Sequence, residues 1–289
     1  MNFLTEKAYA KINLGLDVIR KRPDGYHEVR MVMQTLGLCD ELSVERTDEP
    51  GAVISTDNDN IPAGEDNLIH KAYRLMAETY GLAGGIKVYL KKKIPVAAGL
   101  AGGSSDAAAT MRAVNVLFDL KLTDDRLKEL GVRIGADVPY CITGGTALSE
   151  GIGEILTPLK DCPKCSVLLA KPPVDVSTAH VYGNLRLEQV SHPDIDAITD
   201  GIRSGDIEKI AANLGNVLES VTVSENPVID DIKQLMSDSG AIPGGVLMSG
   251  SGPTVFGLFD SEERCKEAHD RILGSGMAKE VFCTYMTGL

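Results

Sequence analysis

The stretch that most constrains this chain is Gly99-Leu100-Ala101-Gly102-Gly103-Ser104-Ser105, a glycine-rich loop that runs directly into an alanine-rich segment. The alanine run predicts a helix, capped at its start by Ser105 or Asp106. Glycines let a loop backbone approach a ligand closely, and a helix N-terminus offers unpaired N–H groups and the positive end of its dipole. A phosphate group is therefore the expected ligand. The alternative is a turn whose small residues only allow tight packing.

The motifs of the commonest phosphate-binding proteins are absent from the sequence. It has no G-x-x-x-x-G-K-[ST] loop and no H-R-D or D-F-G motif, and the stretch that begins at Gly250 lacks the third glycine of G-x-G-x-x-G. The loop at 99–105 therefore differs from those of the usual P-loop NTPases, dinucleotide-binding proteins and protein kinases.

Residues 8–18 alternate strictly between apolar and other side chains, which predicts a strand with one buried face. The even-numbered residues form the apolar face, so Lys11 and Asn13 share the opposite face. Alternation alone leaves open whether that face meets solvent or a ligand. A solvent-exposed lysine is the ordinary case for a strand.

The rest of the chain predicts a mixture of strands and helices. Helices are expected where apolar residues recur at helical spacing, at 68–80 behind an Asp66-Asn67 cap, 206–214, 228–237 and 260–273. Strands are expected where apolar residues alternate or cluster, at 27–36, 41–45, 86–90, 166–170 and 280–285, and on both sides of a glycine turn within 246–259. The less periodic sequence at 157–163 predicts a boundary between domains 1–160 and 161–289.

Composition restricts the partners and the compartment. The net charge of −12 argues against a nucleic-acid or anionic membrane surface, and no apolar run is long enough to predict a membrane span. Charged residues near the N-terminus argue against an export signal, and the scattered cysteines are typical of reduced thiols in a cytoplasm. Cys162 and Cys165 form one close pair, but no second pair completes a zinc site, so two thiols in a loop are expected.

Three motifs, in order along nearly the whole chain, resemble those of the GHMP small-molecule kinases. They are AKINLGL at residues 10–16, the loop Pro95-x-x-x-Gly99-Leu100-x-x-Gly103-Ser104-Ser105, and MSGSGPTVFG at residues 248–257. The resemblance implies an α+β kinase of two domains, the first like ribosomal protein S5 and the second ferredoxin-like, with the active site in the cleft between them. It also implies ATP and Mg²⁺ as cofactors.

The same resemblance implies a set of nucleotide-binding residues. The phosphates are expected on the loop and the adenine beside the start of the helix at 68–80. The residues concerned are Pro95, Gly99, Leu100, Ala101, Gly102, Gly103, Ser104, Ser105, Asn67 and Leu68.

Longer stretches resemble one branch of the family, which phosphorylates the tertiary C2 hydroxyl of a cytidyl diphosphate sugar alcohol in the non-mevalonate route to isoprenoid precursors. They are KINLGLDVIRKRPDGYHEVRMVMQTL, IPVAAGLAGGSSDAAA and GADVPYCITGG. The resemblance implies that Tyr26 stacks on the cytosine, that His27 hydrogen-bonds to it, and that Thr178 and Tyr182 approach it from the second domain. Taken alone, Tyr26-His27 would be an ordinary hairpin tip.

The resemblance also implies a catalytic pair, Lys11 and Asp137. A carboxylate within hydrogen-bond reach can accept the proton of the attacking hydroxyl, and a nearby ammonium offsets the charge that develops on the oxygens. Asn13, on the same strand face as Lys11, would bind the substrate or orient Asp137. Taken alone, Asp137 would be an ordinary turn carboxylate before Pro139.

Several alternatives stay open at this point. Another GHMP kinase, such as a homoserine or phosphomevalonate kinase, is the nearest rival, and Tyr26-His27 argues against it. A nucleotide-binding regulator without catalysis is a second rival, and RNA binding, suggested by an S5-like fold, conflicts with the negative charge. No glutamate matches the magnesium ligand of some relatives, so the metal ligands are open, as is the choice between monomer and homodimer.

Overall fold

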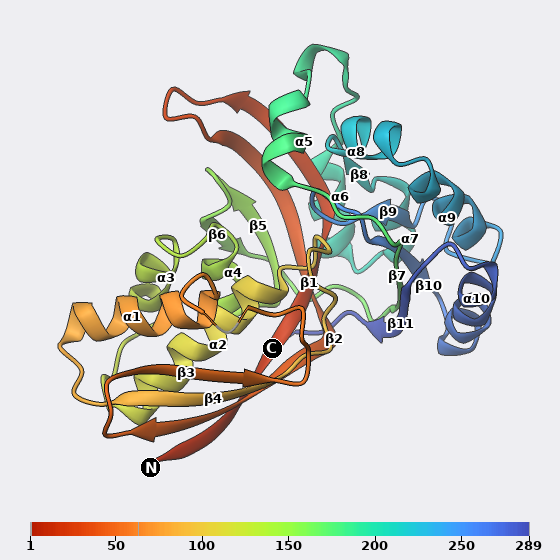
Figure 1. Ribbon diagram of the computed structural model, residues 1–289. Coiled ribbons are helices and arrows are strands. Elements are labelled where there is room, and N and C mark those ends of the chain that lie inside the picture. Colours follow the sequence, from red (N-terminus) through yellow and green to blue (C-terminus); the bar gives the residue numbers. More distant parts are fainter. Residues whose placement is uncertain (1, 63, 289) are drawn as a thin grey trace. The chain divides into compact units, whose positions relative to one another are not determined.

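The computed structural model describes residues 2–62 and 64–288, which form two compact units (Figure 1). The first unit contains residues 2–10, 38–62, 64–96 and 101–144, and the second contains residues 11–37, 97–100 and 145–288. Two long strands, β1 (Phe3–Lys21) and β2 (His27–Thr47), contribute residues to both units. Because the units interleave along the chain, they do not test a boundary between consecutive domains, and the boundary near residue 160 stays a prediction.

The first unit has a mixed sheet in the order β3-β4-β2-β1. Strand β3 (Gly51–Thr56) runs parallel to β4 (Gly85–Lys91), and β4 runs antiparallel to β2. The helices of this unit pack on one another, α1 against α2 and both α2 and α3 against α4 (Figure 1). Their bounds are α1 (Leu68–Tyr80), α2 (Gly102–Leu117), α3 (Asp124–Gly131) and α4 (Val138–Thr143). Fully buried apolar side chains from the sheet and from α1 and α2 form the core: Leu42, Ile69, Met76, Ile86, Leu90 and Met111.

Helix α1 begins and ends as its sequence predicts. Asn67 is the N-cap, and its side chain accepts a hydrogen bond from the Ile69 N–H. The helix ends at Gly81, whose φ of 62° is left-handed. Glycine adopts that conformation without steric cost, so it terminates the helix.

Helix α2 begins earlier than predicted, and neither Ser105 nor Asp106 caps it. The N-cap position is Ala101, with a left-handed φ of 57° and no side-chain cap, and the helix starts at Gly102. Ser105 and Asp106 are buried inside the helix. The prediction was wrong because the loop reaches helical geometry through backbone conformation rather than through a side-chain cap.

The second unit contains further pairings of β1 and β2. Strand β5 (Thr146–Glu150) runs antiparallel to β2 and to β6 (Ile155–Pro158), and β8 (Gly215–Asn216) runs parallel to β1. A separate antiparallel sheet of this unit has the order β11-β7-β10-β9. Its strands are β7 (Ser166–Lys171), β9 (Val246–Met248), β10 (Val255–Phe259) and β11 (Glu280–Tyr285).

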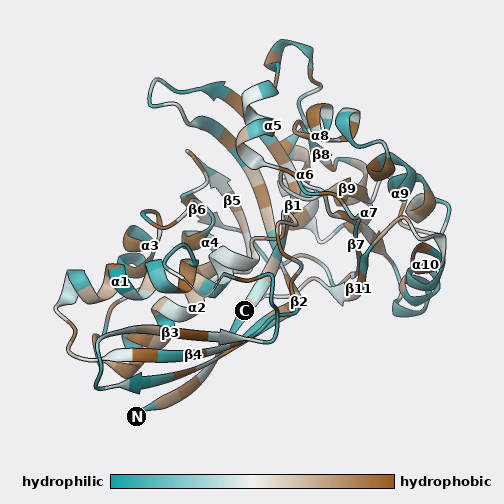
Figure 2. Cartoon of the chain, viewed as in Figure 1, coloured by the Kyte–Doolittle hydropathy of each residue, from teal (hydrophilic) through white to brown (hydrophobic). Residues whose placement is uncertain are grey.

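Helices α9 (Val228–Ser237) and α10 (Glu262–Ser275) pack on this separate sheet. In Figure 2, α10 carries hydrophilic turns while the neighbouring strands carry hydrophobic residues, as expected for a helix with one buried face. The other short elements of the unit are α5 (Thr178–Asn184), η1 (Leu187–Gln189), α6 (Ile195–Ser204), α7 (Ile207–Ala212) and α8 (Glu219–Glu225). Mixed and antiparallel sheets covered by helices confirm the predicted α+β class.

The predicted strands at 27–36 and 41–45 are one continuous strand, β2. Gly37 lies at the expected break but makes no turn. A Cβ atom on Gly37 would lie 2.6 Å from the Tyr285 ring, so the glycine allows close packing of β11 instead. The prediction of a break was wrong because the sequence does not distinguish these two uses of glycine.

Candidate active site

The N-terminus of α2 has the geometry expected of a phosphate site. Gly103 is exposed and Ser104 half-buried at the start of the helix, and Ala101 supplies no side-chain cap. The first N–H groups of a helix have no intrahelical acceptor, so those of α2 are available to an anion. Ser105 differs from its neighbours, because it is buried and its hydroxyl donates to the Tyr9 carbonyl over 2.7 Å. Its side chain anchors the helix to β1.

The predicted adenine residues lie beside the same loop. A Cβ atom on Gly103 would lie 3.3 Å from Leu68 Cδ1, so the Leu68 side chain packs over the loop backbone. The Asn67 side chain is occupied by local structure, since its amide nitrogen donates to the Pro62 carbonyl while its oxygen caps α1. Leu68 is therefore the better placed of the two for contact with a base.

Asp137 occupies the N-cap position of α4, but its side chain makes no capping hydrogen bond. The carboxylate is half-buried, and within its own unit the described residues offer it no hydrogen bond or ion pair. The preceding turn approaches the phosphate loop, because a Cβ atom on Gly135 would lie 3.8 Å from Ser104 Oγ. A carboxylate that local structure does not use is available to accept a proton.

Lys11 and Asn13, in the second unit, are buried rather than solvent-exposed. Their exposed fractions are 4% and 1%. Lys11 Nζ donates to Asn13 Oδ1 over 2.7 Å and to the Gly99 carbonyl over 3.0 Å. At Lys11 and Asn13, the face of β1 that alternation left open therefore does not meet solvent, and the Lys11 ammonium is held by neutral oxygens.

The glycine turn after β9 packs on the residues around Lys11. Gly99 has a φ of 73°, and a Cβ atom there would lie 2.2 Å from the Ser249 carbonyl oxygen. The Ser249 hydroxyl donates to the Gly99 carbonyl over 2.9 Å, and the Leu100 carbonyl accepts from the Lys11 N–H. Only glycine permits this approach. Sequence reasoning missed Ser249, although the small residues of Ser-Gly-Ser-Gly are a signal of close backbone packing.

The residues predicted to bind the base also lie in the second unit. The rings of His27 and Tyr182 have centroids 5.0 Å apart and planes tilted by 39°. Tyr26 is 60% exposed, and the Thr178 and Ser251 hydroxyls are hydrogen-bonded over 2.8 Å. Burial, with a smaller effect of Lys21, lowers the pKa of His27, which favours a neutral imidazole with one donor and one acceptor.

The predicted loop thiols are free cysteines. Burial raises the pKa of Cys162 to about 12 and that of Cys165 to about 11. Both thiols therefore stay protonated at neutral pH, which makes them poor nucleophiles and poor metal ligands. Among the described residues, no group of three or more His, Cys, Asp or Glu side chains could hold a metal ion.

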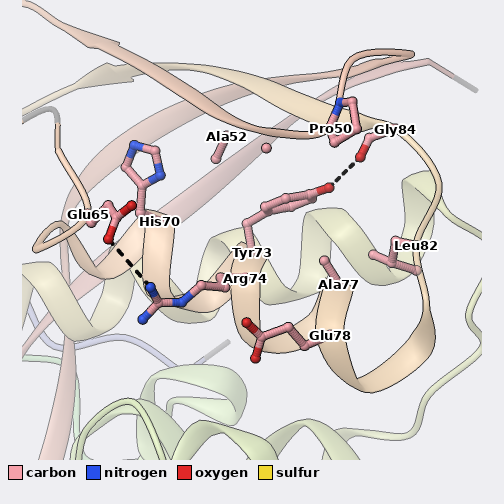
Figure 3. Close-up of a pocket in the computed structure, with 11 residues that line it drawn as sticks. Pro50, Ala52, Glu65, His70, Tyr73, Arg74, Ala77, Glu78, Leu82 and Gly84 are labelled. Carbon is pink, nitrogen blue, oxygen red and sulfur yellow. Dashed lines mark hydrogen bonds and ion pairs between the residues drawn. The ribbon is translucent and has the colours of Figure 1, made fainter.

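A groove beside α1 is lined by none of the predicted site residues (Figure 3). It is lined by Pro50 and the start of β3, by Glu65, by part of α1 and by the segment that follows α1. The Tyr73 hydroxyl donates to the Gly84 carbonyl, and Arg74 pairs with Glu65 over 3.7 Å. The side chains of Tyr73, Arg74 and Glu65 along the groove thus already have partners.

Comparison with known proteins places these features in a family. The model of the GHMP kinases N terminal domain matches residues 67–145, and that of the GHMP kinases C terminal domain matches residues 198–277. A 4-diphosphocytidyl-2-C-methyl-D-erythritol kinase of Lachnospira eligens is 52% identical over 285 residues, 98% of each chain. One of Geobacillus kaustophilus is 50% identical over 286 residues, 99% of this chain and 97% of the relative.

Solved structures agree with these matches. The crystal structure of a 4-(cytidine 5'-diphospho)-2C-methyl-D-erythritol kinase has a TM-score of 0.84 to this chain at 31% sequence identity. The match covers 99% of this chain and 100% of that one. Sequence and structure therefore agree over nearly the full length.

Proposed function

Because this chain belongs to the GHMP kinase family, whose members are small-molecule kinases that use ATP, we propose that it phosphorylates the C2 hydroxyl of 4-diphosphocytidyl-2-C-methyl-D-erythritol. The reaction belongs to the non-mevalonate route to isoprenoid precursors. The observation that carries the choice of substrate is about half identity, over nearly the whole chain, to kinases named for it.

The phosphate site supports binding of ATP through the backbone. Residues 102–104 begin a helix that has no side-chain cap, so their N–H groups and the helix dipole favour a bound anion. Pro95, Gly99, Leu100 and Ala101 shape the loop that leads to this helix. Leu68 covers the loop at Gly103 and supplies an apolar surface for the adenine.

We assign proton transfer to Asp137. An alcohol is a poor nucleophile until its proton leaves, and a carboxylate within hydrogen-bond reach accepts that proton. Asp137 is half-buried and makes no capping bond, so its oxygens are available to a substrate hydroxyl. Lys11 supplies the positive charge that stabilises oxygens on which negative charge develops. Asn13 holds the Lys11 ammonium through its side-chain oxygen.

Base recognition falls to the aromatic residues of the second unit. Tyr26 and Tyr182 offer faces for stacking on cytosine, and the His27 ring offers a donor and an acceptor to the edge of the base. Thr178 contributes a hydroxyl whose position is set by Ser251. The His27–Tyr182 ring contact supports this assignment, because it brings residues 155 positions apart in sequence together.

Mg²⁺ belongs to the proposal as well. The ion takes most of its ligands from phosphates and water and only one or two from the protein, so a kinase site needs no cluster of carboxylates. Within the first unit, the Ser104 hydroxyl at the start of α2 is the protein oxygen proposed to hold it. The chemistry it supplies is neutralisation of the phosphate charge.

We propose a cytoplasmic enzyme with small-molecule partners and no nucleic acid. The named relatives are bacterial metabolic enzymes, and the net charge of −12 disfavours phosphate backbones as ligands. Within the described residues, no helix is long and apolar enough to cross a membrane.

An assay of ADP release, coupled to a second enzyme, tests the substrate. Purified protein is offered ATP and Mg²⁺ with the cytidyl substrate, or with mevalonate, homoserine or galactose at equal concentration. The cytidyl substrate is expected to be turned over efficiently and the others to remain near background. Comparable turnover of another alcohol, or ATP binding without turnover of any, contradicts the proposal.

A further inference from the structure

Beneath the start of α2, one lysine is buried between two carboxylates. Lys92 follows β4, and its Nζ lies 2.5 Å from Asp40 Oδ2 and 2.8 Å from Asp106 Oδ2. The exposed fractions of the three side chains are 3%, 0% and 6%. All three residues belong to the first unit, and none is among the residues assigned to the reaction above.

The cluster holds both limbs of the glycine-rich loop. On the incoming limb, Asp40 Oδ1 accepts the backbone N–H groups of Lys93 over 2.6 Å and Ile94 over 2.8 Å, immediately before Pro95. On the outgoing limb, Asp106 belongs to the first turns of α2. Lys92 bonds to both carboxylates at once, so a single ammonium joins the segment that enters the loop to the helix that leaves it.

The ammonium also lies directly against the loop backbone. A Cβ atom on Gly102, the first residue of α2, would lie 3.0 Å from Lys92 Nζ and 3.1 Å from Ile94 Cγ2. A displacement of Lys92 would therefore shift the first helical turn. That turn carries the N–H groups proposed to bind the phosphates.

Stability alone is a weak explanation for such a cluster. Removing several charges from water is costly, and apolar side chains of similar volume often stabilise a protein as well or better. The arrangement here is also incomplete, because Asp106 Oδ1 is buried and has no hydrogen-bond partner among the described residues. What the cluster provides that apolar residues would not is a set of directional bonds to both limbs.

We propose that Lys92 is a positioning residue for ATP: through Asp40 and Asp106 it fixes the two limbs of the loop so that the N–H groups of α2 face the phosphates. The proposal rests on the proposed function, because it takes ATP to be the ligand of the loop. If the cluster served only folding, a variant of lower stability would show changes in both KM values and in kcat together. If the cluster positions the loop, a folded variant shows a change in the KM for ATP alone.

Two substitutions of Asp106 separate these roles. Asp106→Ala removes the bond between Lys92 and the helix but leaves the balanced Lys92–Asp40 pair, so the variant is expected to fold. Asp106→Asn keeps an acceptor oxygen for Lys92. Lys91→Met and Lys93→Met are the matched controls, because these neighbouring lysines are exposed.

We expect Asp106→Ala to raise the KM for ATP by about tenfold or more, since small misplacements at a binding site have effects of this order or larger. Its kcat and its KM for the cytidyl substrate should stay within about threefold of wild type, and Asp106→Asn should restore the KM for ATP to within about threefold. An unchanged KM for ATP in folded Asp106→Ala overturns the proposal, as does an equal rise in both KM values. Failure of Asp106→Asn to restore the KM also overturns it.

Direct titration of ATP by calorimetry keeps this test independent of the choice of substrate. If the wild-type protein binds ATP but phosphorylates none of the alcohols, the proposed substrate is wrong. The Kd values of the two Asp106 variants then still decide the role of the cluster. A tenfold weaker Kd for Asp106→Ala supports it, and equal Kd values overturn it.

Discussion

Two of the buried lysines of this chain, one in each unit, have opposite surroundings. Lys92 in the first unit is held by the carboxylates of Asp40 and Asp106. Lys11 in the second unit is held by the side-chain oxygen of Asn13 and the carbonyl of Gly99, and its own unit supplies it with no carboxylate among the described residues. Both side chains are almost entirely removed from solvent.

This difference teaches that the counter-charge, more than burial, indicates what a buried lysine does. Burial acts to lower the pKa of Lys92, but the charges of Asp106 and Asp40 outweigh it, so the pKa is raised and the ammonium is satisfied within the protein. Lys11 has only neutral oxygens around it in its unit, so its charge remains available to an anionic group. The first arrangement suits positioning, and the second suits stabilisation of charge on a substrate.

The largest expected effect is on catalysis. Lys11→Met and Asp137→Asn should each lower kcat by about 10²–10⁴, because positive charge or the proton acceptor is lost at the reacting oxygens. The double variant should lose much less than the product of the two single losses, since residues that act as a unit are not additive. Steady-state kinetics of the three variants, with circular dichroism to confirm folding, provides the measurement.

Lys7→Met is the control for this prediction, since Lys7 lies on the same face of β1 and is exposed. It should retain the wild-type kcat. If folded Lys11→Met also retains it, Lys11 is a structural lysine like Lys92 and the contrast between the two disappears.

The next effect is on stability, where the order of the two lysines reverses. Lys92→Met leaves two buried carboxylates without their cation and should lower the unfolding free energy by about 3–5 kcal/mol. Lys11→Met removes hydrogen bonds to neutral oxygens and should cost roughly 1–2 kcal/mol. Urea unfolding at neutral pH compares the two. A larger loss for Lys11→Met would mean that the carboxylates around Lys92 are not the source of its role.

Titration of Asp106 in the Lys92 cluster should make the unfolding free energy depend on pH. Burial, opposed by Lys92, raises the pKa of Asp106 from 3.8 to about 7. Because the folded protein then holds a proton that the unfolded chain releases, this contribution to stability is complete below pH 3.8 and is lost as the pH rises towards 7. Asp106→Asn cannot titrate, so its unfolding free energy should fall less steeply with pH across this window. Urea unfolding at a series of pH values measures both slopes, and equal slopes would assign the proton elsewhere.

Local sequence signals predicted many elements because their causes are local. The cap at Asn67 and the apolar spacing behind it define α1, and alternation defines β11 at Glu280–Tyr285, as predicted. Three ordered motifs predicted the family, which the comparisons confirm. These signals lie within a few residues of what they specify, so a single sequence carries them.

The buried cluster could not be predicted, because its members are far apart in sequence. Asp40 and Lys92 are separated by 52 positions, and neither stands in a recognisable motif. The sequence offers Ser105 or Asp106 as the cap of α2, whereas both lie inside the helix and Asp106 pairs with Lys92. Alternation likewise placed Lys11 away from the apolar face but could not show that this second face is buried too. In both regions tertiary contacts decide the environment of the lysine.

The smallest expected effect concerns binding of the cytosine base. It tests whether the base site of the second unit can be altered without altering ATP binding. Tyr182→Ala should raise the KM for the cytidyl substrate by an amount equivalent to about 1–3 kcal/mol, because one stacking face is lost. The KM for ATP should stay unchanged, which is the reverse of the pattern expected for Asp106→Ala. Tyr89→Ala, an exposed tyrosine of the first unit, is the matched control and should alter neither KM. Initial rates with each substrate varied in turn give both values. If Tyr182→Ala raises both KM values equally, the nucleotide and base sites are not separable in this way, and the assignment of Tyr182 to the base is wrong.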